Sequence, residues 1–375
     1  MVKTAVDILR RLVAIPSVSS LPNQEMIDYA AKRLKGWDIA FYPYRDAAWV
    51  DKMNLVAQCG PPGTAELALV CHTDTVPFDL AWKGALDSAV RGGKLYGCGS
   101  CDVKGFLACV LAAVSQTDVR RLSKPLALVL TADEEVGCVG AKFLAEKKAV
   151  RARYTIIGEP TGLRPVRAGK GYALAEILVR GKEAHSAFPA RGRSAIYDAA
   201  SVVARLERVA KKLETRKDRS FDPPFTTLNV GLIQGGTAKN IVPGECRITV
   251  EWRPIPGQDP EWTANLIRDE LTRLAVDAQL DVKRLDPPFE PAETHDLSLL
   301  LESLSGRKPA SVSFGSEAVH LRSGSEETIV FGPGDMTVAH KTGEFVPIAE
   351  LNECVDYLKA AIERLCGAEK RPYSR

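Results

Sequence analysis

The chain has 375 residues, of which 45% are hydrophobic and 26% are charged. This is an ordinary globular composition, which argues against collagen-like, intrinsically disordered and disulfide-scaffold proteins. Fifty Lys and Arg residues against 47 Asp and Glu residues leave a formal charge of +3. No basic run is interleaved with aromatic residues, so we do not expect nucleic acid as a partner.

The N-terminal segment, residues 1–13, alternates charged and apolar residues at helical spacing and lacks the apolar stretch and cleavage site of a signal peptide. We expect it to form the first helix of the fold. No stretch approaches the roughly 20 apolar residues of a membrane span, so no membrane partner is expected. Nine cysteines, an odd number, and the absence of an export signal predict a soluble cytoplasmic protein with reduced thiols.

Short apolar runs alternate with helical patterns from residue 50 to 165, and the same pattern returns from about residue 310 to 345. Such alternation is typical of βα units around a mainly parallel sheet, which places the fold in the α/β class. The expected elements are the strands 67–71, 126–130, 154–157 and 328–331, with helices that include 105–114 and 351–365.

The section between these two parts has a different order of elements. It reads strand, helix, strand, strand, helix, strand, which is the order of the split βαβ, ferredoxin-like sandwich. The expected elements are the strands 172–180, 226–232, 247–253 and 279–285 and the helices 194–215 and 260–276. We therefore expect an α/β domain formed by residues 1–167 and 286–375, with residues 168–285 inserted as a separate α+β domain.

Histidine and acidic residues follow several of the expected α/β strands, and one acidic residue lies in a Gly-rich turn just before a helix. In open α/β sheets, ligands bind beyond the carboxyl ends of the strands, where the loops diverge. A single histidine or a Glu-Glu pair is more often structural than functional, but several such positions at one sheet edge indicate a site. They are His72, Asp74, Asp102, Glu134, Glu135, Glu159 and His340.

The residue types of this set favour a divalent metal site. Carboxylates that share a site repel one another and take up protons unless cations accompany them. Imidazole and carboxylate ligands suit zinc, cobalt or manganese better than calcium or magnesium, and the absence of thiolates favours catalytic zinc. The pair Cys98 and Cys101 lacks a second such pair or a nearby histidine, so we do not expect a structural zinc site there.

The motifs carrying these residues resemble a known family. They are His72-Thr-Asp-Thr-Val-Pro, Asp102-Val-Lys-Gly, Asp133-Glu-Glu, Gly158-Glu-Pro-Thr and the late His340, together with Gly181-Lys-Glu-Ala-His185-Ser-Ala-Phe-Pro in the inserted domain. The chain resembles, over nearly its whole length, the metallohydrolases that include acetylornithine deacetylase, succinyl-diaminopimelate desuccinylase, aminoacylase and carboxypeptidase G2. This resemblance implies a two-zinc amidohydrolase whose inserted domain is a lid, often used to form a homodimer.

Within that family, three segments look most like the acetylornithine deacetylases: Lys170-Gly-Tyr172, Phe314-Gly-Ser-Glu-Ala318 and residues 332–345. The resemblance implies hydrolysis of N2-acetyl-L-ornithine to L-ornithine and acetate, a step of arginine biosynthesis. The alternatives are a deacylase of another N-acyl amino acid, such as acetylcitrulline or succinyl-diaminopimelate, a dipeptidase or carboxypeptidase of the same family, and, more remotely, a non-catalytic binding protein.

The resemblance also implies roles for single residues around the two metal ions. Asp102 would bridge the ions, His72 and Glu159 would complete one site, and Glu135 and His340 the other. Two such cations lower the pKa of a water molecule and give a nucleophile at neutral pH. Glu134 would be the general base that takes the proton of this water.

The resemblance also implies roles for residues that are not metal ligands. Asp74, two residues beyond His72, would accept the second imidazole N–H of that histidine. The partner's His185 would stabilise the negative charge of the tetrahedral intermediate. Asn240 and Arg253 resemble lid residues that bind the substrate carboxylate; a turn Asn and a surface Arg are the alternative interpretation.

One departure from the family pattern lies beside the bridging residue. The family carries Arg-Gly before the small residues that precede the bridging aspartate, whereas this chain has Cys98-Gly99, with Cys101 next to Asp102. All the expected ligands are intact, so metal binding is expected to persist. The altered loop is a place where substrate or metal preference can differ.

Overall fold

The computed structural model describes residues 4–368. Residues 1–3, the start of the segment expected to be helical, lie outside this range. The expected first helix is present as α1 (Ala5–Val13). Thr4 caps it: its hydroxyl accepts the Asp7 N–H while the Asp7 carboxylate accepts the Thr4 N–H, a reciprocal capping box. No helix within residues 4–368 combines the length and the apolar character that crossing a membrane requires.

The chain forms two compact units. The first comprises Met1–Arg167, Pro291–Ala310 and Ser316–Arg375, and the second comprises Ala168–Glu290 and Ser311–Gly315. The second unit therefore extends beyond residue 285, where the sequence pattern placed its end. Backbone hydrogen bonds explain this: Phe289 and Gly169 exchange two N–H···O bonds of 3.0 Å, and the Lys170 N–H donates to the Val312 carbonyl at 3.1 Å.

The first unit contains most of an eight-stranded mixed sheet with the order β1-β2-β6-β3-β7-β16-β8-β15. Its four central strands run parallel and contain the four strands expected from the sequence. The β1–β2 and β2–β6 pairs at one side of the sheet are antiparallel, as is the β16–β8 pair at the other. The strands are β1 (Asp38–Arg45), β2 (Asp51–Cys59), β3 (Ala65–His72), β6 (Leu126–Thr131), β7 (Ala152–Ile157), β8 (Val166–Gly169), β15 (Ala310–Val312) and β16 (Ser325–Val330).

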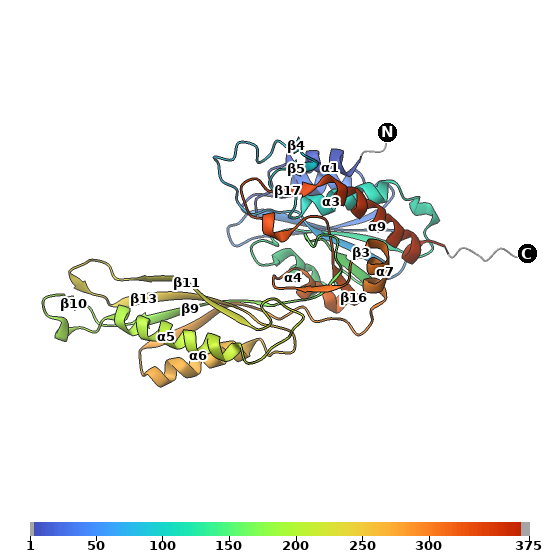
Figure 1. The fold of residues 1–375 in the computed structure, drawn as a ribbon. Coiled ribbons are helices and arrows are strands. Elements are labelled where there is room, and N and C mark those ends of the chain that lie inside the picture. Colours follow the sequence, from blue (N-terminus) through green and yellow to red (C-terminus); the bar gives the residue numbers. More distant parts are fainter. Residues whose placement is uncertain (1–3, 369–375) are drawn as a thin grey trace, which may run out of the picture. The chain divides into compact units, whose positions relative to one another are not determined.

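Helices cover this sheet and bury its central strands. All six residues of β6 are buried, as expected for a strand covered on both faces. Figure 1 shows α1, α3 (Lys104–Ser115) and α9 (Ile348–Cys366) packed on one face, with α4 (Val139–Glu146) on the other. The remaining helices are α2 (Gln24–Ala31), α7 (Asp296–Ser305) and α8 (Ala318–Leu321).

A small three-stranded sheet connects distant parts of the first unit. It consists of β4 (Val90–Arg91), β5 (Lys94–Tyr96) and β17 (Phe345–Pro347), in the order β17-β5-β4. The pairing of β17 with β5 brings the loop that follows β16 beside the Gly-rich turn before α3. The Gly97 N–H donates to the Glu344 carbonyl at 3.0 Å. In this way Asp102 and His340 come to share one region.

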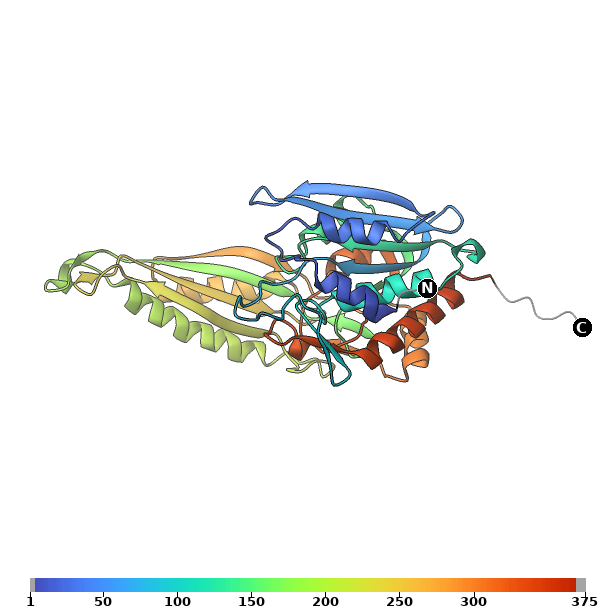
Figure 2. The same ribbon diagram turned by 90° about the horizontal axis from the view of Figure 1, so that it is seen from above.

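The second unit has the expected βαββαβ order and an antiparallel sheet with the order β11-β13-β9-β14. Burial alternates along β9 and β13, and the buried positions face the helices α5 and α6. Figure 2 shows this layer of helices along the sheet. The elements are β9 (Tyr172–Arg180), α5 (Ala195–Leu213), β11 (Thr227–Gly235), β13 (Glu245–Arg253), α6 (Glu261–Leu274) and β14 (Ala278–Asp286), with a separate pair β10 (Ala184–His185) and β12 (Ile241–Val242).

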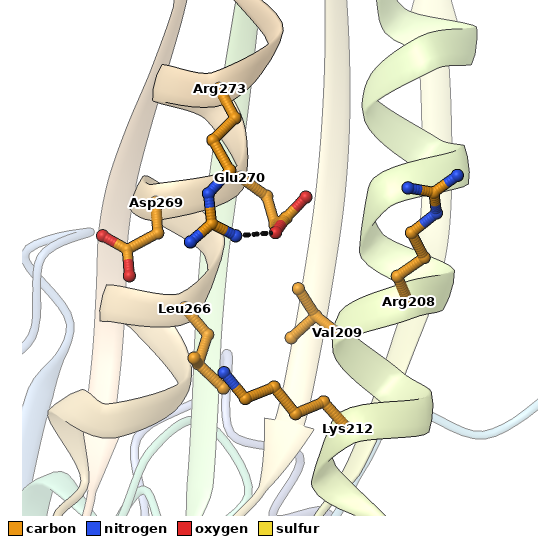
Figure 3. Close-up of a pocket in the computed structure, with 7 residues that line it drawn as sticks. All are labelled: Arg208, Val209, Lys212, Leu266, Asp269, Glu270 and Arg273. Carbon is orange, nitrogen blue, oxygen red and sulfur yellow. Dashed lines mark hydrogen bonds and ion pairs between the residues drawn. The ribbon is translucent and has the colours of Figure 1, made fainter.

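Helices α5 and α6 lie side by side and leave a charged groove between them (Figure 3). Glu270 of α6 accepts hydrogen bonds from Arg205 of α5, at 3.2 Å, and from Arg273, one turn along α6, at 2.5 Å. Apolar side chains of both helices, Val209 and Leu266, form part of the wall. The Glu270 carboxylate is thus paired with two arginines.

Candidate active site

The candidate site residues of the first unit lie at one edge of its sheet. His72 is the last residue of β3, and Glu134 and Glu135 come shortly after the end of β6. Glu159 follows β7 by two residues, and His340 lies in the loop that follows β16. Because these four strands are parallel, their carboxyl ends meet at the same edge. The parallel direction of the four strands therefore brings these side chains to one edge of the sheet.

Ligand-type atoms gather in two groups that share one residue. His72, Asp102 and Glu159 form one group, and Asp102, Glu135 and His340 form the other; within each, the atoms lie within 4.8 Å of one another. His72 Nε2 is 3.2 Å from Asp102 Oδ1, and His340 Nε2 is 3.1 Å from Asp102 Oδ2. Each oxygen of Asp102 therefore belongs to a different group, as in a carboxylate that bridges two ions.

Glu134 lies beside both groups. One of its carboxylate oxygens is within 4.8 Å of ligand atoms of His72 and Glu135. Burial raises the pKa of Glu134 to about 8, and the negative charge of Glu135 adds to this shift, while the positive charge of His72 opposes it. A carboxyl group with this pKa is suited to accept and release a proton near neutral pH.

The cluster contains more negative groups than its histidines can neutralise. It joins the carboxylates of Asp102, Glu134, Glu135 and Glu159 to two imidazoles. Burial raises the pKa of Glu159 and of Glu135, and repulsion from Asp102 raises both further. Burial also acts on Asp102, but hydrogen bonds from His340 and His72 outweigh it and lower the pKa of Asp102.

These features fit a pair of divalent cations. Two cations would remove the repulsion that now favours protonated carboxyl groups, and the nitrogen and oxygen donors match the preferences of zinc, cobalt or manganese. The imidazole geometry agrees, since His72 Nδ1 is 3.0 Å from the Asp74 backbone oxygen. Donation through Nδ1 leaves Nε2, the atom beside Asp102, with a lone pair for a metal ion.

The contact made by Asp74 differs from the one expected. Its carboxylate oxygen Oδ1 is 3.7 Å from His72 Nδ1, too far for a hydrogen bond, so the backbone carbonyl of Asp74 is the acceptor. The carboxylate instead accepts the backbone N–H groups of Glu134, at 3.1 Å, and Glu135, at 3.3 Å. Ser19 Oγ donates to it as well, at 2.7 Å. These three donors draw the carboxylate away from the imidazole, so Asp74 orients the Glu134–Glu135 turn.

Glu344 is a further site residue, which the sequence indicates only as one member of the segment 332–345. Its buried carboxylate accepts three backbone N–H groups, from Gly99 at 2.9 Å, Cys101 at 2.8 Å and Asp102 at 3.0 Å. Burial raises the pKa of Glu344 to about 7, although these donors oppose the shift. Glu344 therefore fixes the turn that presents Asp102. Its position four residues after His340 was the only signal in the sequence.

The turn before Asp102, where the chain departs from the family pattern, is tightly packed. Cys98 and Cys101 are buried, and burial raises the pKa of both thiols. Gly99 has φ +74°, and a Cβ atom there would lie 2.6 Å from Thr75 Cγ2. Glycine is therefore needed at residue 99 for both backbone conformation and space, while the two thiols are neutral packing groups.

The second unit places its three candidate residues at two separate positions. His185 lies on β10, which pairs with β12, and the Ser186 N–H donates to the Asn240 carbonyl at 3.0 Å. His185 and Asn240 are therefore neighbours. Arg253 is the last residue of β13, whose nine residues begin just after β12. At roughly 3.3 Å per residue, this strand separates Arg253 from Asn240 by about 30 Å.

Arg253 has its own set of neighbours. Its guanidinium carbon lies 4.9 Å from the centre of the Tyr172 ring, and its Nε is 3.8 Å from Glu251. The nearby Lys170 is buried, and its ammonium donates to the carbonyls of Pro223 and Phe225, both at 2.7 Å. Burial lowers the pKa of Lys170, and the charge of Arg253 lowers it further. Two cations therefore lie close together here, with Glu251 beside Arg253 and Asp222 near Lys170.

Comparison with known proteins identifies the family. Residues 68–364 match the model described as "Peptidase family M20/M25/M40". The chain belongs to this family. It is 49% identical over 369 residues to an acetylornithine deacetylase of Myxococcus xanthus, with 96% of this chain and 97% of the relative covered. It is 33% identical over 383 residues to an acetylornithine deacetylase of Proteus mirabilis, with 98% of each covered. Members of this family are metal-dependent hydrolases of amide bonds.

The fold agrees with this assignment. The structure of the aminopeptidase PepT from Bacillus cereus superimposes with a TM-score of 0.76 at 23% identity, covering 96% of this chain and 98% of that one. The likeness covers both units of the chain. The α/β fold class expected from the resemblance is therefore confirmed.

Proposed function

We propose that the protein hydrolyses N2-acetyl-L-ornithine to L-ornithine and acetate, a reaction of arginine biosynthesis, in the cytoplasm. The observation that carries the proposal is the sharing of Asp102 between two groups of metal-ligand type, with Glu134 beside both. The identity of 49% to an acetylornithine deacetylase over nearly the whole chain supports this substrate.

In this proposal, His72, Asp102 and Glu159 hold one divalent cation, and Asp102, Glu135 and His340 hold the other. Zinc is the favoured metal, with cobalt and manganese as alternatives. When bound, the two cations polarise the acyl carbonyl and lower the pKa of the attacking water. The remaining steps fall to side chains of the chain itself.

Glu134 is the proposed proton carrier. Its carboxylate takes a proton from the water whose oxygen attacks the acyl carbon, and a C–O bond forms. As the C–N bond of the amide breaks, Glu134 returns that proton to the leaving nitrogen, so the products are acetate and the free amine of ornithine. Asp74 supports this role because it binds the N–H groups of both Glu134 and Glu135.

The second unit supplies the remaining proposed contacts. His185 would donate to the oxygen that becomes negative in the transition state, and Asn240 and Arg253 would bind the substrate carboxylate. Because the length of β13 separates Asn240 from Arg253, one copy of this unit cannot bring both to one carboxylate. We therefore propose a homodimer, formed through the second unit, in which His185 and Asn240 complete the site of the other chain.

The substrate assignment is tested by incubating metal-loaded protein with N2-acetyl-L-ornithine and measuring acetate and ornithine. Acetylcitrulline, N-succinyl-diaminopimelate and a C-terminal dipeptide serve as competing substrates. We expect acetylornithine to give the highest kcat/KM and chelator-treated protein to be inactive. Efficient cleavage of another compound without turnover of acetylornithine would overturn the substrate, though not the amide hydrolysis.

The shared site is tested by mixing two inactive variants, Glu134→Gln and His185→Ala, in one co-expressed preparation. In a mixed dimer, one site would carry both changes and the other would carry neither. Random pairing would then restore about one quarter of the wild-type activity. Activity no higher than that of the separate variants would contradict the exchange of His185 between chains.

A further inference from the structure

The residue before Glu134 has an unusual backbone conformation. Asp133 has φ +59°, in the left-handed region that residues other than glycine rarely adopt, and its side chain is 1% exposed. Aspartate tolerates this region better than most residues, but surrounding contacts must hold it there. The conformation lies at the point where the chain turns from β6 into Glu134 and Glu135.

Two side chains of the neighbouring strands hold the Asp133 carboxylate. Tyr44 Oη donates to Asp133 Oδ2 at 2.7 Å, and Lys52 Nζ forms an ion pair with Asp133 Oδ1 at 2.8 Å. Tyr44 lies on β1 and Lys52 on β2, and the two residues are directly opposite each other in the antiparallel pairing. Oδ2 therefore accepts a hydrogen bond and Oδ1 lies in an ion pair, and the sheet sets the spacing of these two partners.

Lys52 is itself fixed. Its side chain is 1% exposed, and its ammonium also donates to the backbone carbonyls of Ser19 and Leu21. Lys52 also pairs with Asp46 at 3.8 Å, but its contact with Asp133 is a full ångström closer, so the buried ammonium and the Asp133 carboxylate hold each other in place. Ser19 extends the network, because its hydroxyl donates to Asp74 at 2.7 Å.

Side chains bind the backbone of this turn on both sides of Asp133. On the far side of Asp133, the Asp74 carboxylate binds the N–H groups of Glu134 and Glu135. On the near side, Asn54 of β2 accepts the Ala132 N–H at 2.9 Å. The backbone of four consecutive residues, 132–135, is thus fixed by side chains that lie outside the two metal-ligand groups.

We infer that Tyr44 and Lys52 are positioning residues: through Asp133 they fix the turn that places the Glu134 carboxylate for proton transfer and the Glu135 carboxylate in the Asp102–Glu135–His340 group. The inference rests on the proposed function for the role of Glu134. The placement of Glu135 depends only on the geometry of the first unit.

The network predicts an effect on one metal group and not on the other. His72 and Glu159 come from β3 and the end of β7, and neither follows the Asp133 turn. Loss of a residue that orients a metal ligand commonly costs about 10–100-fold in metal affinity or activity. We therefore expect Tyr44→Phe to weaken metal binding selectively at the group that contains Glu135, whereas general destabilisation would weaken both groups together.

The test is a titration of metal-stripped protein with Co²⁺, followed by visible absorption and calorimetry. Tyr44→Phe removes one hydroxyl, and Tyr42→Phe, two residues earlier on the same strand, is the matched control. We expect Tyr44→Phe to weaken the Glu135-containing site about tenfold and to leave the other site within about threefold. The control should leave both sites unchanged. Equal weakening of both sites, or of neither, would overturn the inference.

Activity gives a second, separable test once wild-type turnover is established. Tyr44→Phe should lower kcat about tenfold with KM nearly unchanged, since Glu134 acts in the transition state. If Tyr44 acts through Asp133, adding Tyr44→Phe to Asp133→Asn should cause little further loss. Full additivity of the two losses would contradict this route. Because the Co²⁺ titration uses no substrate, it tests the positioning role of Tyr44 even if the proposed substrate is wrong.

Discussion

Two regions of the molecule are rich in charge, and they differ in how that charge is balanced. In the α5–α6 groove, the Glu270 carboxylate accepts hydrogen bonds from Arg205 and from Arg273, and Figure 3 shows the second of these. At the edge of the large sheet, four carboxylates share two imidazoles, and burial raises the pKa of three of these carboxylates. Carboxylates alone therefore do not mark a site. Carboxylates that the protein leaves without enough cations do, because something else must neutralise them.

The largest expected effect concerns the proton carrier of the uncompensated cluster. Glu134→Gln keeps the size of the side chain but removes the carboxylate, so kcat should fall about 1,000-fold while both metal ions stay bound. Steady-state kinetics and metal analysis of the same sample check this. A kcat within a few fold of wild type, with two ions bound, would exclude Glu134 as the general base.

The next largest effect concerns the residue shared by both groups. Asp102→Asn removes the charge that faces His72 and His340, so affinity for both cations should fall by about 100-fold. Equilibrium dialysis against Zn²⁺ measures it, with Asp87→Asn, at an exposed residue, as the control. Loss of only one ion would show that Asp102 does not bridge the two groups.

Much of the metal-ligand cluster could be predicted from the sequence. Apolar runs indicate where strands end, and the residues at those ends show which side chains could be ligands. The four parallel strands and the group around Asp102 were both within reach of such reasoning. The hairpin of β1 and β2 was not, since most residues of β1 are exposed or half-buried and form no apolar run. Tyr44 and Lys52, which hold Asp133, therefore gave no signal.

Other features depend on pairings that no local pattern encodes. Asp74 was expected to accept the second imidazole N–H of His72; its carboxylate lies 3.7 Å from that nitrogen and also accepts the backbone N–H groups of Glu134 and Glu135. The separation of Asn240 from Arg253 follows from the register of β13 in its sheet. The hydrogen bond from the Asp102 N–H to the Glu344 carboxylate joins segments more than 240 residues apart in the sequence.

A smaller effect concerns the pH dependence of stability without metal. The pKa of Glu134 is raised from 4.5 to about 8 in the folded chain, so the folded state holds a proton that the unfolded chain releases. Its stabilising contribution is complete below pH 4.5 and is lost as the pH rises towards 8. Glu344, with its pKa raised to about 7, acts in the same direction.

Metal-stripped protein should therefore lose a few degrees of Tm between pH 5 and pH 8, and the gain in Tm on adding Zn²⁺ should grow over the same interval. Differential scanning calorimetry of stripped and loaded samples measures both trends. A gain that shrinks as the pH rises would mean that the cluster does not depend on metal for its charge balance.

The smallest effect is expected at Glu270 of the α5–α6 groove, whose carboxylate is already paired. Glu270→Gln breaks the pairs with Arg205 and Arg273 at the surface, so it should change the free energy of unfolding by about 1 kcal/mol or less. Denaturant unfolding and kcat measure the two consequences, and kcat should equal that of wild type. A large loss of activity would show that the groove takes part in function after all.

The most direct measurement of the central claim is a calorimetric titration of metal-stripped wild-type protein with Zn²⁺ at pH 7.5, with proton release recorded in buffers of different ionisation enthalpy. We predict two ions per chain and a net release of protons, because the imidazole of His340, whose pKa is raised to about 10, must lose a proton to bind a metal ion. Binding of fewer than two ions, or binding without proton release, would contradict the account.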